Sequence, residues 1–325
     1  MSPQVSVLIS AFNAGEFIDQ SVGSALAQSF ADLEVIVVND GSTDDTARRL
    51  ARRKDPRLRV IEQSNQGLAA AYNAGVRAAQ GTFIGFLDAD DVWFPRKLER
   101  HIRVHQDNPG LDVTFSWVHM IDAEGKPVRV PCPRWRGAVS FPQLLTDYVI
   151  RTSSAAVMRR DAFERAGPLD STLVRCIDFE FFLRVSLLRP GNLCAIEEVL
   201  TSYRRHPNQR TRDWRRVRQG WNQMLAGIRM RAPAETKRVE KVAASNFHRY
   251  LASVAYEEGN FGDACRLICR AYSLAPVAFV RDPRNWKMAA AAIAGIALPE
   301  KALLMVERSA GFDRPIEINP SGKSS

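Results

Sequence analysis

The first half of the chain alternates between short apolar runs and segments with helical spacing of apolar residues. The apolar runs predict four strands, at residues 5–9, 33–38, 58–63 and 82–90. Between and after them, apolar positions recur every three or four residues and predict helices at residues 15–28, 44–53, 67–80 and 95–106. Because strands that alternate with helices form layered α/β sheets with parallel strands, we expect one such layer here.

The pattern changes in the second half of the chain. Strands are expected at residues 112–122 and 192–206, with a helix that has an aromatic face at residues 177–188. After Trp214 only helical patterns follow, and residues 250–276 resemble a single tetratricopeptide repeat without a clear second copy. We therefore predict a first domain at residues 1–213, a helical region at 214–312 and a disordered tail at 313–325. The helical region is expected either to pack on the first domain or to form a partner surface, which leaves open an oligomer built through these helices.

The charge and the cysteines limit the classes of partner and compartment. A net charge of +9 indicates a basic surface, which suits nucleic acid, anionic lipid or a phosphorylated small molecule. We expect no nucleic-acid partner, because the net charge is the only feature that suggests one. The Arg-rich stretch at residues 203–219 fits contact with phosphate, a lipid surface, or a solvated helix face. Five cysteines without metal-ligand spacing favour reduced thiols in a cytoplasmic protein, with Cys265 and Cys269 packed on one helix face. No leader peptide or membrane-spanning helix is expected.

Polar side chains follow each of the four predicted strands of the first half. They are Ser10 and Asn13, Asn39 and Asp40, Asn65, and Asp88 and Asp90. Because ligands gather at the carboxyl ends of parallel strands, these residues predict one polar, acidic cleft. Asp88 and Asp90, spaced as DxD, suit a hard divalent cation such as Mn²⁺ or Mg²⁺. The alternative is that Asp90 and Asp91 only cap the helix that begins near Pro95.

Six segments, taken in order, resemble family 2 glycosyltransferases of the GT-A fold. They are VSVLISAFNAGEFIDQSVGSALAQSF, LEVIVVNDGSTDDT, NQGLAAAYNAG, GTFIGFLDADD, CIDFEFFLRV and SYRRHPNQRT, and the resemblance covers roughly residues 3–210. The resemblance implies the nucleotide-diphospho-sugar transferase fold, a Rossmann-like mixed sheet flanked by helices. It implies inverting, metal-assisted transfer of a hexose from a nucleotide-sugar donor, with a UDP-sugar favoured, to a hydroxyl of a glycan or lipid-linked acceptor. Such enzymes serve cell-envelope polysaccharide assembly, so contact with the inner face of a membrane is open.

The resemblance also assigns roles to individual residues. Ser10 and Phe12 would lie against the base of the nucleotide, and Asp40 would accept a hydrogen bond from it. Asp88 would touch the ribose or the metal, Asp90 would be the principal metal ligand, and His206 would reach the metal or the diphosphate. The nucleoside would be bordered by Asn13, Asn65, Gly67 and Asn73.

The CIDFEFFLRV segment resembles the family's later acidic motif, and the resemblance implies that its Asp178 is the catalytic base, the carboxylate that takes the proton from the attacking acceptor hydroxyl. Glu180, two residues later, is the rival candidate. Tyr72 stands where the family often has an arginine, and Ile177 where it often has an acidic residue. A Rossmann dinucleotide site is not expected, since no GxGxxG follows the first strand. A non-catalytic nucleotide- or glycan-binding module with a degenerate transferase fold is the alternative, although Asp88, Asp90 and Asp178 are all present.

Overall fold

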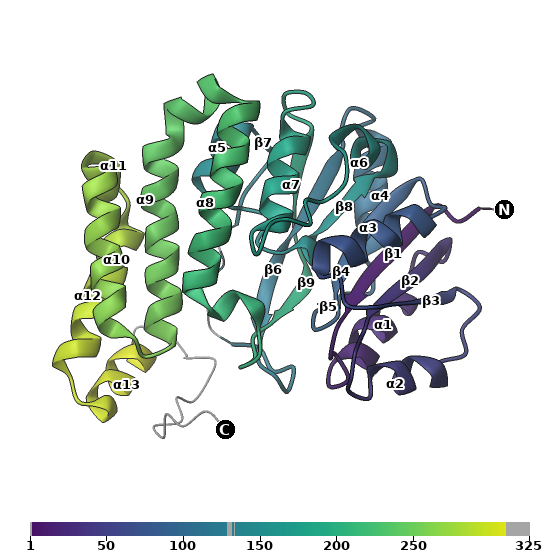
Figure 1. Ribbon diagram of the computed structural model, residues 1–325, viewed down its shortest axis with the longest axis horizontal. Coiled ribbons are helices and arrows are strands. Elements are labelled where there is room, and N and C mark those ends of the chain that lie inside the picture. Colours follow the sequence, from purple (N-terminus) through teal and green to yellow (C-terminus); the bar gives the residue numbers. More distant parts are fainter. Residues whose placement is uncertain (1, 129–131, 133, 310–325) are drawn as a thin grey trace.

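The structure, a computed structural model, describes residues 2–309 except 129–131 and 133, and shows a sheet-containing part joined to a group of helices (Figure 1). Within these residues nine strands form one mixed sheet in the order β3-β2-β1-β4-β8-β6-β9-β5, with β7 paired to β9. The first four strands run parallel, and β8 pairs antiparallel with β4. The strands are β1 (Val5–Ala11), β2 (Leu33–Asp40), β3 (Leu58–Gln63), β4 (Phe83–Asp88), β5 (Val92–Trp93), β6 (Val113–Ile121), β7 (Ala138–Val139), β8 (Ala156–Arg159) and β9 (Leu193–Arg204).

Helices cover both faces of this sheet because neighbouring strand residues point to opposite sides. In β1, Val7 and Ile9 pack with apolar residues of α1, α2 and α4, whereas Leu8 packs on the other side with α3, α6 and α7. Strands buried on both faces explain the uninterrupted apolar runs in the sequence. The helices are α1 (Ile18–Leu26), α2 (Thr46–Arg52), α3 (Leu68–Ala78), α4 (Lys97–Asp107), α5 (Phe141–Thr146), α6 (Arg160–Ala166) and α7 (Ile177–Ser186).

Only helices follow the last strand in the described chain. They are α8 (Trp214–Arg231), α9 (Pro233–Glu257), α10 (Phe261–Leu274), α11 (Pro276–Arg281), α12 (Pro283–Ala297) and α13 (Glu300–Ser309). Their core continues that of the sheet domain, because the ring of Trp221 lies 5.7 Å from that of Phe179 and stacks on Phe247 at 4.1 Å. The helical region therefore packs on the first domain, one of the two arrangements expected. The predicted disordered tail, residues 313–325, lies outside the described residues.

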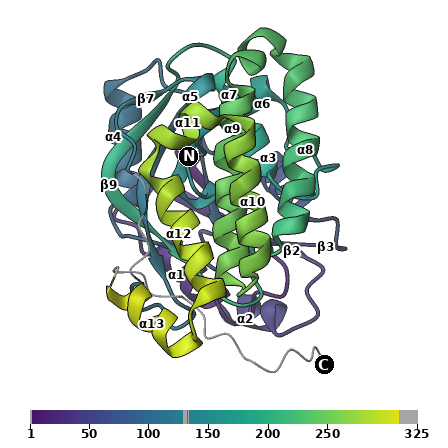
Figure 2. The same ribbon diagram turned by 90° about the vertical axis from the view of Figure 1, so that its left-hand side faces the viewer.

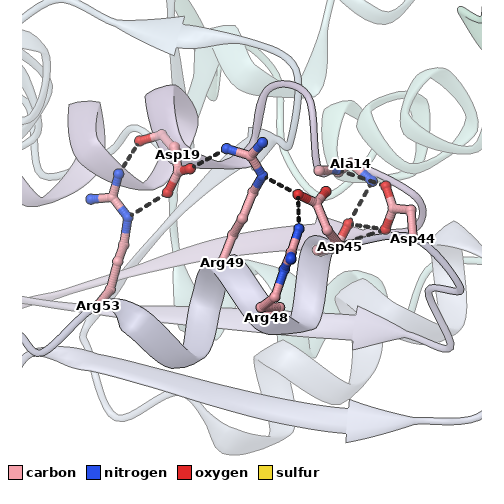
Figure 3. A network of polar contacts seen from close by, with 9 residues as sticks. Ala14, Asp19, Asp44, Asp45, Arg48, Arg49 and Arg53 are labelled. Atoms are coloured by element: carbon pink, nitrogen blue, oxygen red, sulfur yellow. Dashed lines mark hydrogen bonds and ion pairs between the residues drawn. The ribbon is translucent and has the colours of Figure 1, made fainter.

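Polar contacts join α1 and the loop before it to α2 and the loop before it (Figure 3). Arg49 donates hydrogen bonds to Asp19 and Asp45, at 2.9 and 2.8 Å, and Arg53 donates to Asp19 at 3.1 Å. In the same region the backbone nitrogen of Gly15 donates to Asp44 at 2.9 Å. These ion pairs are partly exposed, so they contribute little to stability and serve mainly to fix the position of α1 relative to α2.

All five cysteines are free thiols, as expected. Cys265 packs against the core, but Cys269 is exposed, so the expectation that both pack is wrong for Cys269. Across the described residues, none of the helices combines the length and apolar character needed to span a bilayer.

Candidate active site

The parallel pairing of β1, β2 and β4 brings the predicted polar residues to one edge of the sheet. Ser10 lies beside Asp88 in the register of β1 and β4, and beside Val38 in that of β1 and β2. Asn39 and Asp40 end β2 at the same edge. The strand ends thus form one polar surface, on which Asp88 at the end of β4 lies beside β1, near the end of β2.

The carboxylate of Asp88 is held by three hydroxyl groups. Tyr72 donates to Oδ1 at 2.6 Å, Thr152 donates to Oδ2 at 3.1 Å, and Ser153 lies 3.1 and 3.2 Å from the two oxygens. Burial, with the negative charges of Asp90 and Asp178, raises the pKa of Asp88 to about 6, although the hydrogen bonds from Tyr72 and Ser153 act in the opposite direction. Asp88 therefore belongs to a strongly acidic site that favours a bound cation.

Asp90 is the more open carboxylate of the cluster, and His206 lies next to it. The Nε2 atom of His206 is 3.0 Å from Oδ2 of Asp90, and its ring packs against Phe17 at 4.9 Å. No three His, Cys, Asp or Glu side chains in the described part of the chain converge as a complete metal cage. A Mg²⁺ or Mn²⁺ ion that takes one or two protein ligands and completes its shell with phosphate oxygens nevertheless fits this donor set.

Asp91 and Arg204 hold the backbone of the turn that contains Asp90 in place. Asp91 is fully buried and accepts a hydrogen bond from the backbone nitrogen of Arg204 at 3.0 Å, and burial raises its pKa. The buried guanidinium of Arg204 donates to the carbonyl oxygen of Asp90 at 2.7 Å and to Gln20 at 2.6 Å. Asp91 is thus a structural residue of the turn, and Asp90 is left to face the cleft.

Asp178 lies in the first turn of α7, and its carboxylate is held by one tyrosine. Tyr148 donates to Oδ2 of Asp178 at 2.7 Å while its ring stacks on Phe179 at 4.3 Å. Burial raises the pKa of Asp178, and the hydrogen bond from Tyr148 lowers it. Because the charge of Asp178 acts on Asp88, the predicted base and the predicted metal ligands belong to one site.

Glu180, the rival base, turns away from that site. Both of its oxygens accept hydrogen bonds from Nε of Arg184, at 2.8 and 2.9 Å, in an ion pair that is almost wholly buried. Arg184 also donates to the carbonyl oxygens of Gly167 and Pro168. A carboxylate held in this way has a structural role, so the geometry favours Asp178 over Glu180.

The edge near β2 has the features of a nucleotide site. Phe12 is 50% exposed and offers an uncovered aromatic face. Asp40 is only 2% exposed and accepts hydrogen bonds from the side chain of Gln63 at 2.7 Å and from the backbone nitrogens of Gln66 and Gly67 at 2.8 Å each. Asp40 therefore shapes the loop after β3, on which Gly67 adopts a φ of 89°.

Two asparagines predicted to border the nucleoside hold the backbone. Asn13, with a φ of 49°, accepts a hydrogen bond from the backbone nitrogen of Thr43 at 2.8 Å, which joins the loops after β1 and β2. Asn73 uses both ends of its amide on the backbone of Leu169, at 2.9 Å each. Asn65 is exposed, and its backbone lies against Gly41. Asn13 and Asn65 are both exposed, whereas both ends of the Asn73 amide are engaged with the backbone.

A basic cavity of about 360 Å³ opens between the loop after β3 and the start of α7. Its lining includes Gly67, Ile177 and three arginines, Arg175, Arg210 and Arg216. The positive charge of Arg210 acts on Asp178, and the charges of Asp88, Asp178 and Asp40 act on Arg210. Positive charge thus lies between the predicted base and the nucleotide edge, where a diphosphate would carry negative charge.

Sequence reasoning missed four residues of this site: Tyr148, Thr152, Ser153 and Arg204. Arg204 is part of the SYRRH segment that the resemblance singled out, so a signal was present. The run of hydroxyl residues at 152–154 was the sequence feature that indicated hydroxyl donors to the Asp88 carboxylate. Tyr148 gave no signal, because only packing brings it to Asp178, thirty residues along the chain.

Sequence comparison relates the chain to glycosyltransferases. Residues 6–167 match the glycosyl transferase family 2 description. An uncharacterized glycosyltransferase of Nostoc sp., alr2836, is 31% identical over 223 residues, which are 62% of this chain and 65% of that protein. The uncharacterized glycosyltransferase EpsJ of Bacillus subtilis is 30% identical over 225 residues, which are 65% of this chain and 64% of that protein. The chain therefore spans just under two thirds of the length of these relatives.

Solved structures share the fold at lower identity. TarS 1–349 of S. aureus in complex with UDP-GlcNAc superposes with a TM-score of 0.63 at 15% identity, covering 90% of each chain. The mannosyltransferase PcManGT of Pyrobaculum calidifontis, in complex with GDP-Man and Mn²⁺, gives a TM-score of 0.53 at 20% identity, covering 97% of this chain and 86% of that one. At these identities the likeness concerns the fold alone, and it confirms the predicted GT-A class.

Proposed function

The chain belongs to glycosyl transferase family 2 through residues 6–167, and from this premise we propose that it is an inverting, metal-assisted hexosyltransferase. Its donor would be a nucleotide sugar, with a UDP-sugar favoured, and its acceptor a hydroxyl group of a glycan or a lipid-linked glycan. The observation that carries the proposal is that one site contains two acidic centres. One is Asp90, which contacts His206, and the other is Asp178, which contacts Tyr148.

Donor binding would use the edge near β2 and the acidic strand end. The exposed ring of Phe12 would stack on the base, and the loop organised by Asp40 would border the nucleoside. UDP is favoured by the family resemblance and by the UDP-GlcNAc complex of the similar TarS structure, whereas PcManGT carries GDP-Man. The donor class is therefore the first property to measure.

Asp90, Asp88 and His206 would hold the divalent cation. When bound, that cation would neutralise charge on the diphosphate as it leaves, without any proton transfer to it. Arg210 would add a second positive charge on the side of the base. Because the carboxylate of Asp88 is already occupied by hydroxyls, Asp90 is the better direct ligand.

Asp178 would act as the base of a single displacement. The acceptor oxygen forms a bond to the anomeric carbon, the bond from that carbon to the diphosphate oxygen breaks, and the hydroxyl proton moves to Asp178. One attack from the face opposite the leaving group inverts the anomeric centre. The hydrogen bond from Tyr148 to Oδ2 would orient the Asp178 carboxylate that receives the proton.

The test combines binding with turnover. Calorimetric titration of UDP and GDP, with and without Mn²⁺, should give metal-dependent binding of one nucleotide that Asp90→Ala abolishes. Transfer from the matching sugar nucleotides to glycan and lipid-linked acceptors should fall at least about 100-fold in Asp178→Asn, while nucleotide affinity is kept. Asp107→Asn, on the exposed surface of α4, is the matched control and should retain full activity.

Two results would count against the proposal. Full transfer by Asp178→Asn would remove that residue from the role of base. Metal-dependent nucleotide binding without transfer to any acceptor by the wild-type protein would favour the alternative function, a binding module with a degenerate transferase fold.

A further inference from the structure

The helices farthest from β3 carry several exposed apolar side chains (Figure 1). We define the apolar face as Tyr272 of α10, Val277 and Val280 of α11, and Trp286, Ile293 and Ile296 of α12, all at least half exposed. Figure 1 places α10 and α12 at the end of the molecule opposite β3, and the turned view in Figure 2 has α11 and α12 in front. Exposed apolar surface on this scale marks a binding surface, because isolated exposed residues do not gather in this way.

The apolar residues of α12 share one side of that helix, and the tryptophan among them is held by its neighbours. Trp286 and Ile293 are seven residues apart and Ile296 is three further, so they share one side of α12, whereas Ala292 on the other side is buried. The ring of Trp286 lies 5.9 Å from that of Phe279, and its Nε1 donates to the carbonyl oxygen of Val280 at 3.1 Å. The indole is thus held in place with its polar atom satisfied and half of its surface uncovered.

Positive charge borders the apolar face. Arg270, Arg281 and Lys287 are exposed on these three helices, and Lys301 is exposed on the next helix, α13. The carboxylates among the described side chains of residues 264–309 are Asp282, which is paired with Arg284 at 2.8 Å, and Glu307, which is buried. An exposed apolar surface with a tryptophan and a basic border has the character of a helix that lies in the interface of an anionic membrane.

We propose that the apolar face docks the protein on an anionic lipid surface. A second copy of the chain is the less favourable occupant, because a symmetric contact would bring the same four basic residues of each copy together. Lipid headgroups offer the complementary charge, and the acyl boundary accepts the aliphatic side chains and the indole. This inference does not depend on the proposed transferase activity.

The experiment is vesicle cosedimentation of the full chain. Binding is expected to vesicles of phosphatidylcholine mixed with phosphatidylglycerol, to be much weaker with phosphatidylcholine alone, and to decline as salt screens the charges. The double variant Ile293→Glu/Ile296→Glu should lower the partition coefficient more than about tenfold. In Arg281→Gln/Lys287→Gln/Lys301→Gln each lost charge should lower it roughly fivefold. Met230→Glu, which changes an 82% exposed methionine on α8, is the matched control and should bind as the wild type does.

Three results would overturn the proposal. One is binding that neither multiple variant weakens, which would assign the lipid contact to another surface. A second is a monomer that binds no vesicles. The third is absent vesicle binding together with a dimer in analytical ultracentrifugation that Ile293→Glu/Ile296→Glu dissociates, which would make a second copy the occupant. Because all these side chains are exposed, the variants should fold, and an unchanged melting temperature checks this.

Discussion

Replacing Tyr148 with phenylalanine tests how the site controls its base. The change removes one oxygen, the donor that lies 2.7 Å from Oδ2 of Asp178, and keeps the ring that stacks on Phe179. Burial raises the pKa of the Tyr148 hydroxyl well above its usual value, so in the wild type this group remains a hydrogen-bond donor at neutral pH. The perturbation is therefore the loss of one hydrogen bond to a charged acceptor.

The direction and size of the effect follow from that bond. Burial already raises the pKa of Asp178, and the Tyr148 hydroxyl opposes this rise by stabilising the charged form. Tyr148→Phe should raise the pKa of Asp178 further, so the acid limb of the pH–rate profile moves to higher pH. A hydrogen bond to a charged group contributes about 1.5–3 kcal/mol, which corresponds to a kcat about 10- to 100-fold lower on the acid side. At pH values above the shifted acid limb, the difference in kcat between Tyr148→Phe and the wild type should become smaller.

The assay is the initial rate of nucleoside diphosphate release, in the presence of acceptor, from about pH 5 to pH 9. Tyr148 does not contact the nucleotide edge, so the KM of the donor should stay constant. Tyr272→Phe, on the exposed surface of α10, makes the same chemical change away from the site and should leave the profile unmoved. A uniform loss of kcat at every pH, with the acid limb in its original position, would refute the reasoning and give Tyr148 a packing role only.

Three further predictions concern the metal, the core and the nucleotide loop. Burial raises the pKa of Asp88 from 3.8 to about 6, so without metal the protonated carboxyl group stabilises the folded state. This contribution to the free energy of unfolding is complete below pH 3.8 and is lost as the pH rises through about 6. Since Mn²⁺ must displace that proton, it should raise the melting temperature more at about pH 7.5 than at about pH 5; equal shifts in scanning fluorimetry would contradict this. Glu180→Gln should lower the free energy of unfolding by about 3–5 kcal/mol in urea titrations, because Arg184 is left buried without its counter-charge, and a loss below about 1 kcal/mol would argue against that role. Gly41 has a φ of 73°, and a Cβ there would lie 2.7 Å from a backbone nitrogen of the loop after β3. Gly41→Ala should therefore weaken UDP binding about tenfold or more in calorimetry, whereas the control Gly110→Ala, in open space, should not. Equal UDP affinities of the two variants would show that the loop does not belong to the site.

Much of the fold was predictable because, in most strands, the pattern of apolar residues in the sequence agrees with the burial of the strand in the structure. The run Val35–Val38 is apolar throughout because its strand is buried on both faces, and the predicted third strand matches β3 at both ends. The segment Lys97–Asp107 shows the opposite case. Its helix was predicted, but Lys97, His101 and His105 are fully buried, although these residue types usually face water. Spacing shows that the three share one helix face, and only the sheet beneath makes that face an interior one.

Lys97 illustrates how the interior accommodates such a residue. Its ammonium group donates to the carbonyl oxygen of Ala155 at 2.9 Å and lies 3.1 Å from Nε2 of His101, with the ring of Trp93 5.2 Å away. Burial lowers the pKa of Lys97 well below its usual value. Ala155 ends the short helix η1 (Ser153–Ala155), whose first residue contacts Asp88, so this buried cluster supports the acidic site from behind.

The sequence by itself determined the residue types that the chemistry requires and their positions at strand ends. Alternation of elements and the parallel pairing that it implies were enough to gather Ser10, Asp40 and Asp88 at one edge, since that outcome depends on topology and not on side-chain detail. Tertiary structure alone decided which donors surround each of the two carboxylates in the first turn of α7. Asp178 meets Tyr148 and the charge of Asp88, whereas Glu180 meets Arg184. The physical reason is that a carboxylate's role depends on its burial and on the donors around it, and those donors come from segments far apart in the chain.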